Sequence, residues 1–184
     1  TGDVNMFTNS MADRLRSKYR ERFFFSNMEI DRGGLDALTS QYDEVVICAG
    51  AYTPFLVPCN IYPVKGYSVT FESTNLPNVS LLDEDAKIVT SSFKGRFRVA
   101  GTAELAGWNH DIRHDRIKPL IDWTRQYTDV DTDKSSRWAC LRPMTPDMLP
   151  IIERREGVII NSGAGHLGWT MSMALAKRAS DLIE

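Results

Sequence analysis

The sequence predicts a mixed fold, between α/β and α+β, and three observations support this class. Segments with a helical spacing of apolar residues alternate with short apolar runs that are typical of strands. The run at 45–48 is continuously apolar, as in a parallel strand that is buried on both faces. The segments at 62–71 and 88–100 have the pattern of an antiparallel meander. We therefore expect a parallel element together with an antiparallel sheet.

The first half of the chain contains one predicted helix and three predicted strands. Apolar residues at Phe7, Met11 and Leu15 predict a helix over 7–19, with Asp3 or Asn5 as its N-terminal cap. The aromatic run at 23–25 and the apolar run at 45–48 each predict a strand. Alternating apolar side chains then predict a longer strand over 62–71.

The second half begins with a hairpin and ends with a helix. Strands at 88–91 and 97–100 are joined by Lys94 and Gly95, which suit a tight turn. A helix is predicted over 114–127, where Pro119 is tolerated only near the start. The remaining predicted elements are strands at 137–141 and 158–160 and a helix at 167–182.

Composition and charge narrow the class of partners. The 184 residues are 42% hydrophobic and 25% charged with a formal net charge of -2, which is ordinary for a globular chain. No basic stripe interleaves with aromatic residues, so nucleic acid is not an expected partner. The histidines and acidic residues lack the spacing of metal ligands, so no metal site is predicted.

Cysteine usage and the absence of long apolar runs bear on location. The three cysteines, Cys48, Cys59 and Cys140, form no CxxC pair and indicate reduced thiols. No apolar stretch has the length of a membrane span. We expect a cytoplasmic location, with peripheral attachment to the inner face of the cytoplasmic membrane as the alternative.

A glycine-rich turn lies between the predicted strand at 158–160 and the last helix. Gly163, Gly165 and Gly168 fall within six residues, where glycine permits left-handed backbone angles or the close approach of another group. Free amides at the start of the following helix favour negative charge. The motif predicts an anionic group at this turn, and a plain helix-capping turn is the alternative.

A second motif, CLRPMTPDMLPII, surrounds Arg142. Its three prolines within eight residues predict a rigid, extended path. Arg142 ends an apolar strand, where a guanidinium needs an anionic partner. That partner is either the carboxylate of Asp147 or Glu104, or the carboxylate of a substrate.

The chain resembles a known family in six segments that occur in the same order. The segments are TGDVNMFT, VVICAGAYTPFL, YPVKGYSVTF, RFRVAGTAELAGW, LRPMTPDMLPII and NSGAGHLGWT. They resemble the C-terminal part of the FAD-dependent D-amino acid dehydrogenases, within the D-amino acid oxidase and glycine oxidase group. The resemblance implies noncovalent FAD and oxidation of a D-amino acid by hydride transfer from its Cα to FAD N5. The products would be a 2-oxo acid and ammonia, and the electrons would pass to an acceptor other than oxygen.

The resemblance also implies roles for particular residues. Arg142 would bind the substrate carboxylate, and Tyr67 would orient the substrate, with core packing as the alternative for Tyr67. Ala164 stands where the family usually has a histidine, and His166 occupies a position that is normally small or hydroxylic, so no catalytic residue is assigned. The residues implied at the cofactor are Ala49, Gly50, Gly163, Gly165, His166, Leu167, Gly168, Trp169 and Thr170.

The same resemblance implies a domain organisation. Residues 1–58 would form a partial FAD-binding, Rossmann-like domain, 59–142 an antiparallel-sheet substrate domain, and 143–184 a return to the FAD-binding domain with its C-terminal helix. The sequence contains no GxGxxG unit followed by an acidic residue, which would hold the pyrophosphate and ribose.

We therefore expect an excised fragment with an incomplete FAD site. It would be inactive alone, would bind FAD weakly, and would self-associate through the edge of the strand at 45–48. The alternative is a complete protein that is a flavin-less binding or interaction module with the substrate-domain fold.

Overall fold

The computed structural model describes residues 2–183, which fold into two compact units. Unit 1 consists of the residues up to Asn27, Gly66–Ala103 and His110–Cys140. Unit 2 consists of Met28–Lys65, Glu104–Asn109 and the residues from Leu141 onward. The expected boundaries after 58 and 142 lie near two of these, although the first helix groups with the antiparallel sheet instead of with the strand at 45–48. The assignment of the units to cofactor and substrate stays a prediction.

An antiparallel hairpin and its neighbours form a five-stranded sheet. The predicted turn at Lys94 and Gly95 is confirmed, since Phe93 pairs with Arg96 and Gly95 has a φ of 71°. The strand predicted at 62–71 is also confirmed. In sheet order, the strands are β3 (Leu82–Asp83), β4 (Ile88–Phe93), β5 (Arg96–Glu104), β2 (Tyr62–Glu72) and β6 (Ser135–Met144).

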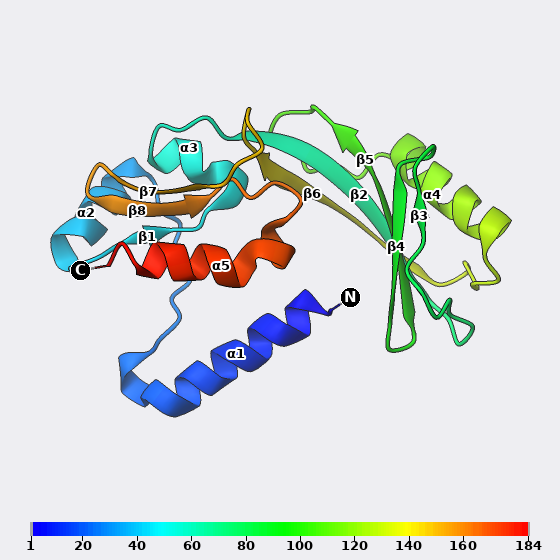
Figure 1. Cartoon of the computed structure of the whole chain (residues 1–184), viewed down its shortest axis with the longest axis horizontal. Helices are drawn as coiled ribbons and strands as arrows, with labels where there is room; N and C mark the ends of the chain where they lie inside the picture. Colours follow the sequence, from blue (N-terminus) through cyan, green and yellow to red (C-terminus); the bar gives the residue numbers. More distant parts are fainter. Residues whose placement is uncertain (1, 184) are drawn as a thin grey trace. The chain divides into compact units, whose positions relative to one another are not determined.

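Helix α4 (His114–Tyr127) covers one face of this sheet and makes the core of unit 1 (Figure 1). The helix has the predicted bounds and contains Pro119. Its apolar side chains meet alternate residues of β2 and β5, so one side of each strand is buried. The buried residues of this cluster are Tyr67, Val69, Phe71, Ile88, Phe97, Val99, Ile117, Leu120, Trp123 and Val130.

The first helix has a polar cap but no buried side chain. Helix α1 (Val4–Tyr19) begins after Asp3, whose carboxylate accepts the backbone N–H of Met6 at 3.1 Å, and none of its own residues is buried. A 3-10 turn, η1 (Arg20–Arg22), follows it. The strand predicted at 23–25 is wrong, because these residues have no neighbouring strand to pair with and Phe24 is 75% exposed.

A three-stranded sheet forms the centre of unit 2. Strand β1 (Val46–Ile47) pairs in parallel with β8 (Val158–Ser162), with Val46 opposite Ile159, and β7 (Ile151–Arg155) pairs antiparallel with β8. The predicted parallel strand is confirmed, but the expectation that it is buried on both faces is wrong, because β1 is short and lies at an edge, where Val46 is 40% exposed. The buried core consists of Leu35, Ile47, Val57, Val158 and Ile160.

Helices complete unit 2. Helix α5 (Gly168–Ser180) lies along this sheet and contacts β7 and β8 (Figure 1). The other helical elements are α2 (Arg32–Gln41), η2 (Gly50–Tyr52) and α3 (Thr53–Leu56). Within residues 2–183, none of the helices combines the length and the apolar composition that a membrane crossing needs.

The proline-rich segment departs from the extended path that its sequence predicts. Between β6 and β7 the backbone forms a turn, in which the Met148 N–H donates to the Thr145 carbonyl at 3.2 Å. The Thr145 hydroxyl also donates to the Leu149 carbonyl at 2.8 Å, which closes the loop. A side chain that bonds to the backbone thus overrides the extended preference of the prolines.

Candidate cofactor and substrate site

The parallel pairing of β1 and β8 brings two predicted cofactor segments together. The two strands run in the same direction, so their carboxyl ends lie at the same end of the sheet. The Ser162 hydroxyl donates to the Gly50 carbonyl at 3.1 Å, and the Thr53 hydroxyl donates to Ser162 Oγ at 2.9 Å. The segment that contains Ala49 and Gly50 is therefore hydrogen-bonded to the end of β8, where the glycine turn begins.

The glycine turn requires glycine at two positions. Gly163 and Gly165 have φ angles of 79° and 57°, which disfavour any residue with a Cβ. A Cβ on Gly163 would lie 2.9 Å from Cγ2 of Thr145, and a Cβ on Gly165 would lie 2.9 Å from Sδ of Met144. The turn thus packs closely against the residues that follow Arg142.

A backbone hydrogen bond joins the glycine turn to the arginine motif. The Gly165 N–H donates to the Pro143 carbonyl at 2.9 Å. Arg142 directly precedes Pro143 near the end of β6 and is half-buried. The two motifs that the sequence singles out are therefore in direct contact within unit 2. The turn and the residues after Arg142 also line a small cavity of about 40 Å³.

The two carboxylates considered as partners of Arg142 have other contacts. Glu104 forms an ion pair with Lys65, at 3.9 Å between Oε2 and Nζ. The Asp147 carboxylate accepts a hydrogen bond from the backbone N–H of Leu149 at 3.0 Å, and both residues belong to the turn between β6 and β7.

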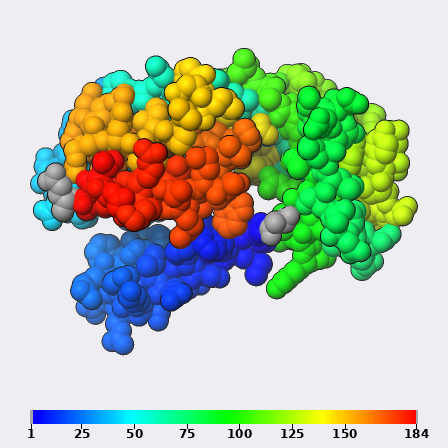
Figure 2. Space-filling model, viewed as in Figure 1, coloured from blue at the N-terminus to red at the C-terminus, as the bar shows by residue number. Residues whose placement is uncertain are grey.

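Helix α5 begins at the end of the glycine turn without a side-chain cap. Its N-cap residue is Leu167, and no side chain among residues 2–183 caps this end of the helix. Gly168, Trp169 and Thr170 form its first turn, with Trp169 exposed, and His166 is exposed just before it. Figure 2 shows this stretch, orange to red, at the surface. Such a helix end favours an anionic or electron-rich group.

Tyr67 lies in the core of unit 1. It is 1% exposed and belongs to the apolar cluster beneath α4. This position favours the packing alternative, and a role in orienting the substrate stays a prediction.

Thr53 and Ser162 are site residues that sequence reasoning missed. Both are buried, and their hydroxyls bond across 109 residues of sequence. Thr53 lies in the segment VVICAGAYTPFL and Ser162 lies in NSGAGHLGWT. No local pattern marks a threonine and a serine as hydrogen-bond partners at such a separation in sequence.

The residues of unit 2 fit one end of a flavin. The glycine turn leads into the N-terminus of α5, which lacks a side-chain cap within the described chain, and Trp169 and Thr170 of its first turn are exposed. These features suit an electron-rich ring edge that approaches backbone amides.

Comparison with known proteins identifies the family of this chain. The model of the family "FAD dependent oxidoreductase" matches residues 3–182. D-amino acid dehydrogenase 3 of Mesorhizobium japonicum is 44% identical over 183 residues, covering 91% of this chain and 43% of that protein. The D-amino acid dehydrogenase of Dechloromonas aromatica is 35% identical, covering 100% of this chain and 50% of that protein. The chain spans about half the length of the curated relatives that it matches.

Solved structures share the fold. Glycine oxidase from Bacillus cereus superposes with a TM-score of 0.64 at 24% identity, covering 76% of this chain and 42% of that one. Glycine oxidase from Geobacillus kaustophilus gives 0.66 at 19% identity, with 76% and 41% covered. The family model, the relatives and the fold confirm the resemblance seen in the six sequence segments. The chain therefore belongs to the FAD-dependent oxidoreductase family that includes the D-amino acid dehydrogenases.

Proposed function

We propose that this chain is part of an FAD-dependent D-amino acid dehydrogenase and supplies one end of its flavin site together with its substrate-carboxylate clamp. The contact between the Gly165 N–H and the Pro143 carbonyl, at 2.9 Å, carries the proposal. The contact holds the residue after Arg142 against the glycine turn. Arg142, as the proposed carboxylate-binding group, would therefore lie near the turn that would face the flavin. A substrate held by Arg142 would then lie near the reactive ring.

The glycine turn and the α5 N-terminus would hold the pyrimidine side of the isoalloxazine ring. Residues 165–170 would approach N1 and the C2 carbonyl, with Ala49 and Gly50 packed against the dinucleotide. The aligned peptide dipoles of α5 favour the negative charge that accumulates at this edge, by roughly 0.3 to 1 kcal/mol. When bound, FAD supplies the acceptor at N5 for a hydride from the substrate Cα.

Arg142 would orient the substrate for this transfer. Its planar guanidinium donates two parallel hydrogen bonds to a carboxylate, which fixes both the position and the direction of the amino acid. Loss of the hydride would convert the neutral amine to an iminium ion, and water would then hydrolyse it to a 2-oxo acid and ammonia, which leaves as ammonium. We assign no protein base, because a neutral substrate amine makes one unnecessary. The electrons would pass to an acceptor other than oxygen.

The decisive experiment compares Arg142 variants of the full-length protein that contains this chain. Arg142→Lys and Arg142→Ala should each raise KM for the D-amino acid at least about tenfold, because a charged hydrogen-bond pair is lost. The flavin absorbance should stay unchanged. Arg137→Ala, in the same strand at an exposed position, should leave KM unchanged. Unaltered steady-state kinetics in both Arg142 variants would remove the assignment.

Substrate class and acceptor need a separate assay. The full-length protein should form 2-oxo acids from D-amino acids with an artificial electron acceptor in the absence of air, and should leave the L-enantiomers unreacted. Turnover that depends on oxygen would refute the dehydrogenase reading. Turnover of L-amino acids alone would refute the substrate class.

A further inference from the structure

A tryptophan of unit 2 contacts the segment that is proposed to pack against the dinucleotide. The Trp108 indole N–H donates to the backbone carbonyl of Ala51 at 3.3 Å. Ala51 is buried and directly follows Gly50, whose φ of 57° lies in the left-handed region. A side chain that is distant in sequence therefore binds the turn that contains Ala49 and Gly50.

An aromatic contact adds to this hydrogen bond. The ring of Trp108 packs against Phe55 of α3, with the centroids 5.0 Å apart and the planes inclined by 60°. Phe55 in turn contacts Tyr52 of η2, at 6.3 Å between ring centroids. Tilted aromatic pairs are stabilising beyond the area that they bury. Trp108 therefore contacts both η2 and α3, the two helical elements that follow Ala49.

A buried lysine holds the segment that carries Trp108. Segment 104–109 belongs to unit 2, and so does Lys65. Lys65 Nζ donates to Asn109 Oδ1 at 2.9 Å and forms the ion pair with Glu104 described above. Because Lys65 is buried and contacts both ends of the segment, the indole between these ends has a fixed position.

The turn at Gly50 is also bound by β8. The Ser162 hydroxyl donates to the Gly50 carbonyl, as described above, so two successive carbonyls, of Gly50 and Ala51, accept hydrogen bonds from distant side chains. A binding segment that is already ordered loses less conformational entropy when its ligand binds, and its affinity is therefore higher. The contacts of Trp108 suit this kind of support.

We propose that Trp108 is a positioning residue for the flavin, which orders the turn at Ala49 and Gly50 before the cofactor binds and so raises the affinity for FAD. It would act through Ala51 and Phe55, without touching the reacting atoms. The inference rests on the proposed function, because it assumes that this turn packs against the dinucleotide. It deepens that function by naming a residue that controls cofactor affinity separately from substrate affinity.

The test measures the FAD affinity of the full-length protein that contains this chain, after removal of its flavin. Trp108→Phe keeps an aromatic ring beside Phe55 but removes the N–H, and should raise the dissociation constant of FAD about fivefold. Trp108→Ala removes both contacts and should raise it at least about twentyfold. At saturating FAD, KM for the D-amino acid should stay at its wild-type value in both variants, because Arg142 is unaltered.

Hydrogen exchange reports on the turn itself in the absence of the cofactor. The Tyr52 N–H donates to the Ala49 carbonyl at 3.0 Å, which closes the turn. In the flavin-free full-length protein, Trp108→Phe should accelerate exchange of this amide at least about threefold, because opening of the turn no longer breaks the bond to Ala51.

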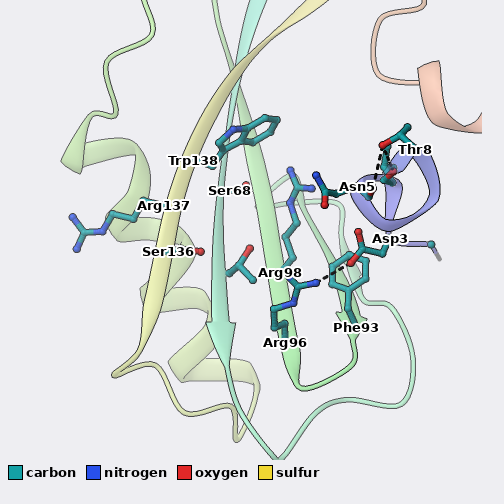
Figure 3. Close-up of a pocket in the computed structure, with 13 residues that line it drawn as sticks. Asp3, Asn5, Thr8, Ser68, Phe93, Arg96, Arg98, Ser136, Arg137 and Trp138 are labelled. Carbon is teal, nitrogen blue, oxygen red and sulfur yellow. Dashed lines mark hydrogen bonds and ion pairs between the residues drawn. The ribbon is translucent and has the colours of Figure 1, made fainter. Parts of the chain in front are cut away.

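A matched control makes the same substitution in unit 1. The Trp123 indole N–H donates to the Asp83 carboxylate at 2.7 Å, so Trp123→Phe also removes one indole hydrogen bond. It should lower the melting temperature but leave FAD affinity unchanged, which separates positioning from a general loss of stability. Trp138 is a less closely matched control, because the face of its indole contacts Arg98, with Cζ at 5.1 Å from the ring centroid (Figure 3).

Several outcomes would overturn the proposal. Wild-type FAD affinity in both Trp108 variants would do so, as would unchanged exchange at Tyr52 or an equal loss of affinity in Trp123→Phe. If Trp108→Ala does not fold, Phe55→Leu removes the aromatic contact from its other side and should weaken FAD binding about threefold, and wild-type affinity there would count equally against the proposal. A wild-type protein without FAD affinity would refute the proposed function itself, whereas failure of this inference alone appears only in the variants.

Discussion

Two glycines share the same backbone angle but differ in their surroundings. Gly157 and Gly163 both have a φ of 79°, whereas an added Cβ meets Cγ2 of Thr145 at 2.9 Å only at Gly163 and meets nothing within 4 Å at Gly157. Gly157→Ala should cost about 1 to 2 kcal/mol of unfolding free energy from backbone strain. Gly163→Ala should cost about 1 to 3 kcal/mol more from overpacking.

Urea unfolding of both variants measures this difference directly. Equal free energies of unfolding would mean that Thr145 moves aside without cost, and that the turn does not require close packing at Gly163. The comparison isolates the steric term, because the strain from the φ angle is common to both positions.

A buried lysine holds the segment after β5 in place. Lys65 is 1% exposed, and its Nζ donates to Asn109 Oδ1 at 2.9 Å and lies 3.9 Å from Glu104 Oε2. Lys65→Met should cost about 3 kcal/mol of unfolding free energy, because it removes the buried ammonium from its ion pair with Glu104 and its hydrogen bond to Asn109. The double variant Lys65→Met, Glu104→Gln should recover part of that loss. Equal stability of the single and double variants in chemical denaturation would show that the pair is uncoupled.

Asp83 makes stability depend on pH. The Ala86 N–H and the Trp123 indole N–H donate to its carboxylate at 2.8 and 2.7 Å, and both hold the pKa of Asp83 below its usual value. A lowered pKa stabilises the fold above the unfolded-state pKa of about 3.9, and this contribution is lost as pH falls through the folded-state pKa. The stability gap between wild type and Asp83→Asn should therefore narrow between pH 6 and about 3. A gap that is constant or widens over that range in denaturant melts would contradict the assignment.

The candidate site was recognisable from sequence where the chemistry is local. The glycine turn and Arg142 stand out because glycines between strand and helix, and an arginine among prolines, are unusual within a few residues. The bond between Thr53 and Ser162 could not be predicted, because its partners are 109 residues apart and each hydroxyl has ordinary neighbours. Tyr67 was ambiguous because alternation does not tell which face of a strand meets a helix.

At the level of elements, strand β1 is the exposed edge of its sheet. It pairs only with β8 in the described sheet order, and Val46 is 40% exposed. Such an edge offers unpaired backbone groups and apolar surface to another chain.

We expect the 184-residue chain to self-associate as its concentration rises, and Val46→Lys should shift this equilibrium towards the monomer. Sedimentation velocity over a range of concentrations measures both effects, with Tyr42→Lys, exposed outside the strand, as control. Equal association of Val46→Lys and wild type would exclude the edge as the interface.

Elements were predictable when periodicity agreed with the final packing. The helix at 114–127 follows from its pattern because it buries the apolar face that the spacing predicts, and the hairpin around Gly95 follows because its two strands are adjacent in sequence. The strand expected at 23–25 fails because aromatic residues favour a strand only where another strand pairs with them. Helix α2 was missed because Gly33 and Gly34 lower its propensity, and it is stabilised by tertiary packing of Leu35.

At the level of the whole molecule, the cofactor site within this chain is partial. In the proposed arrangement, the turn and the α5 N-terminus would contact only the ring end of a flavin, and the sequence has no glycine-rich unit for the pyrophosphate. We expect the purified 184-residue chain to be colourless. Titration with FAD should give no saturable quenching of tryptophan or flavin fluorescence at micromolar concentrations. The full-length protein, as control, should retain its flavin through gel filtration. Stoichiometric FAD on the 184-residue chain after the same step would contradict the expectation.

The parallel pairing of β1 with β8 also sets the order in which the polypeptide can fold during synthesis. Thr53 leaves the ribosome 109 residues before its hydrogen-bond partner Ser162. At roughly 5 to 20 residues per second, the interval is on the order of 5 to 20 seconds. During that time β1 lacks its partner β8, whereas the hairpin of β4 and β5 closes as soon as it emerges. The sheet of unit 2 therefore closes only after β8 has emerged, later than the local hairpin of unit 1.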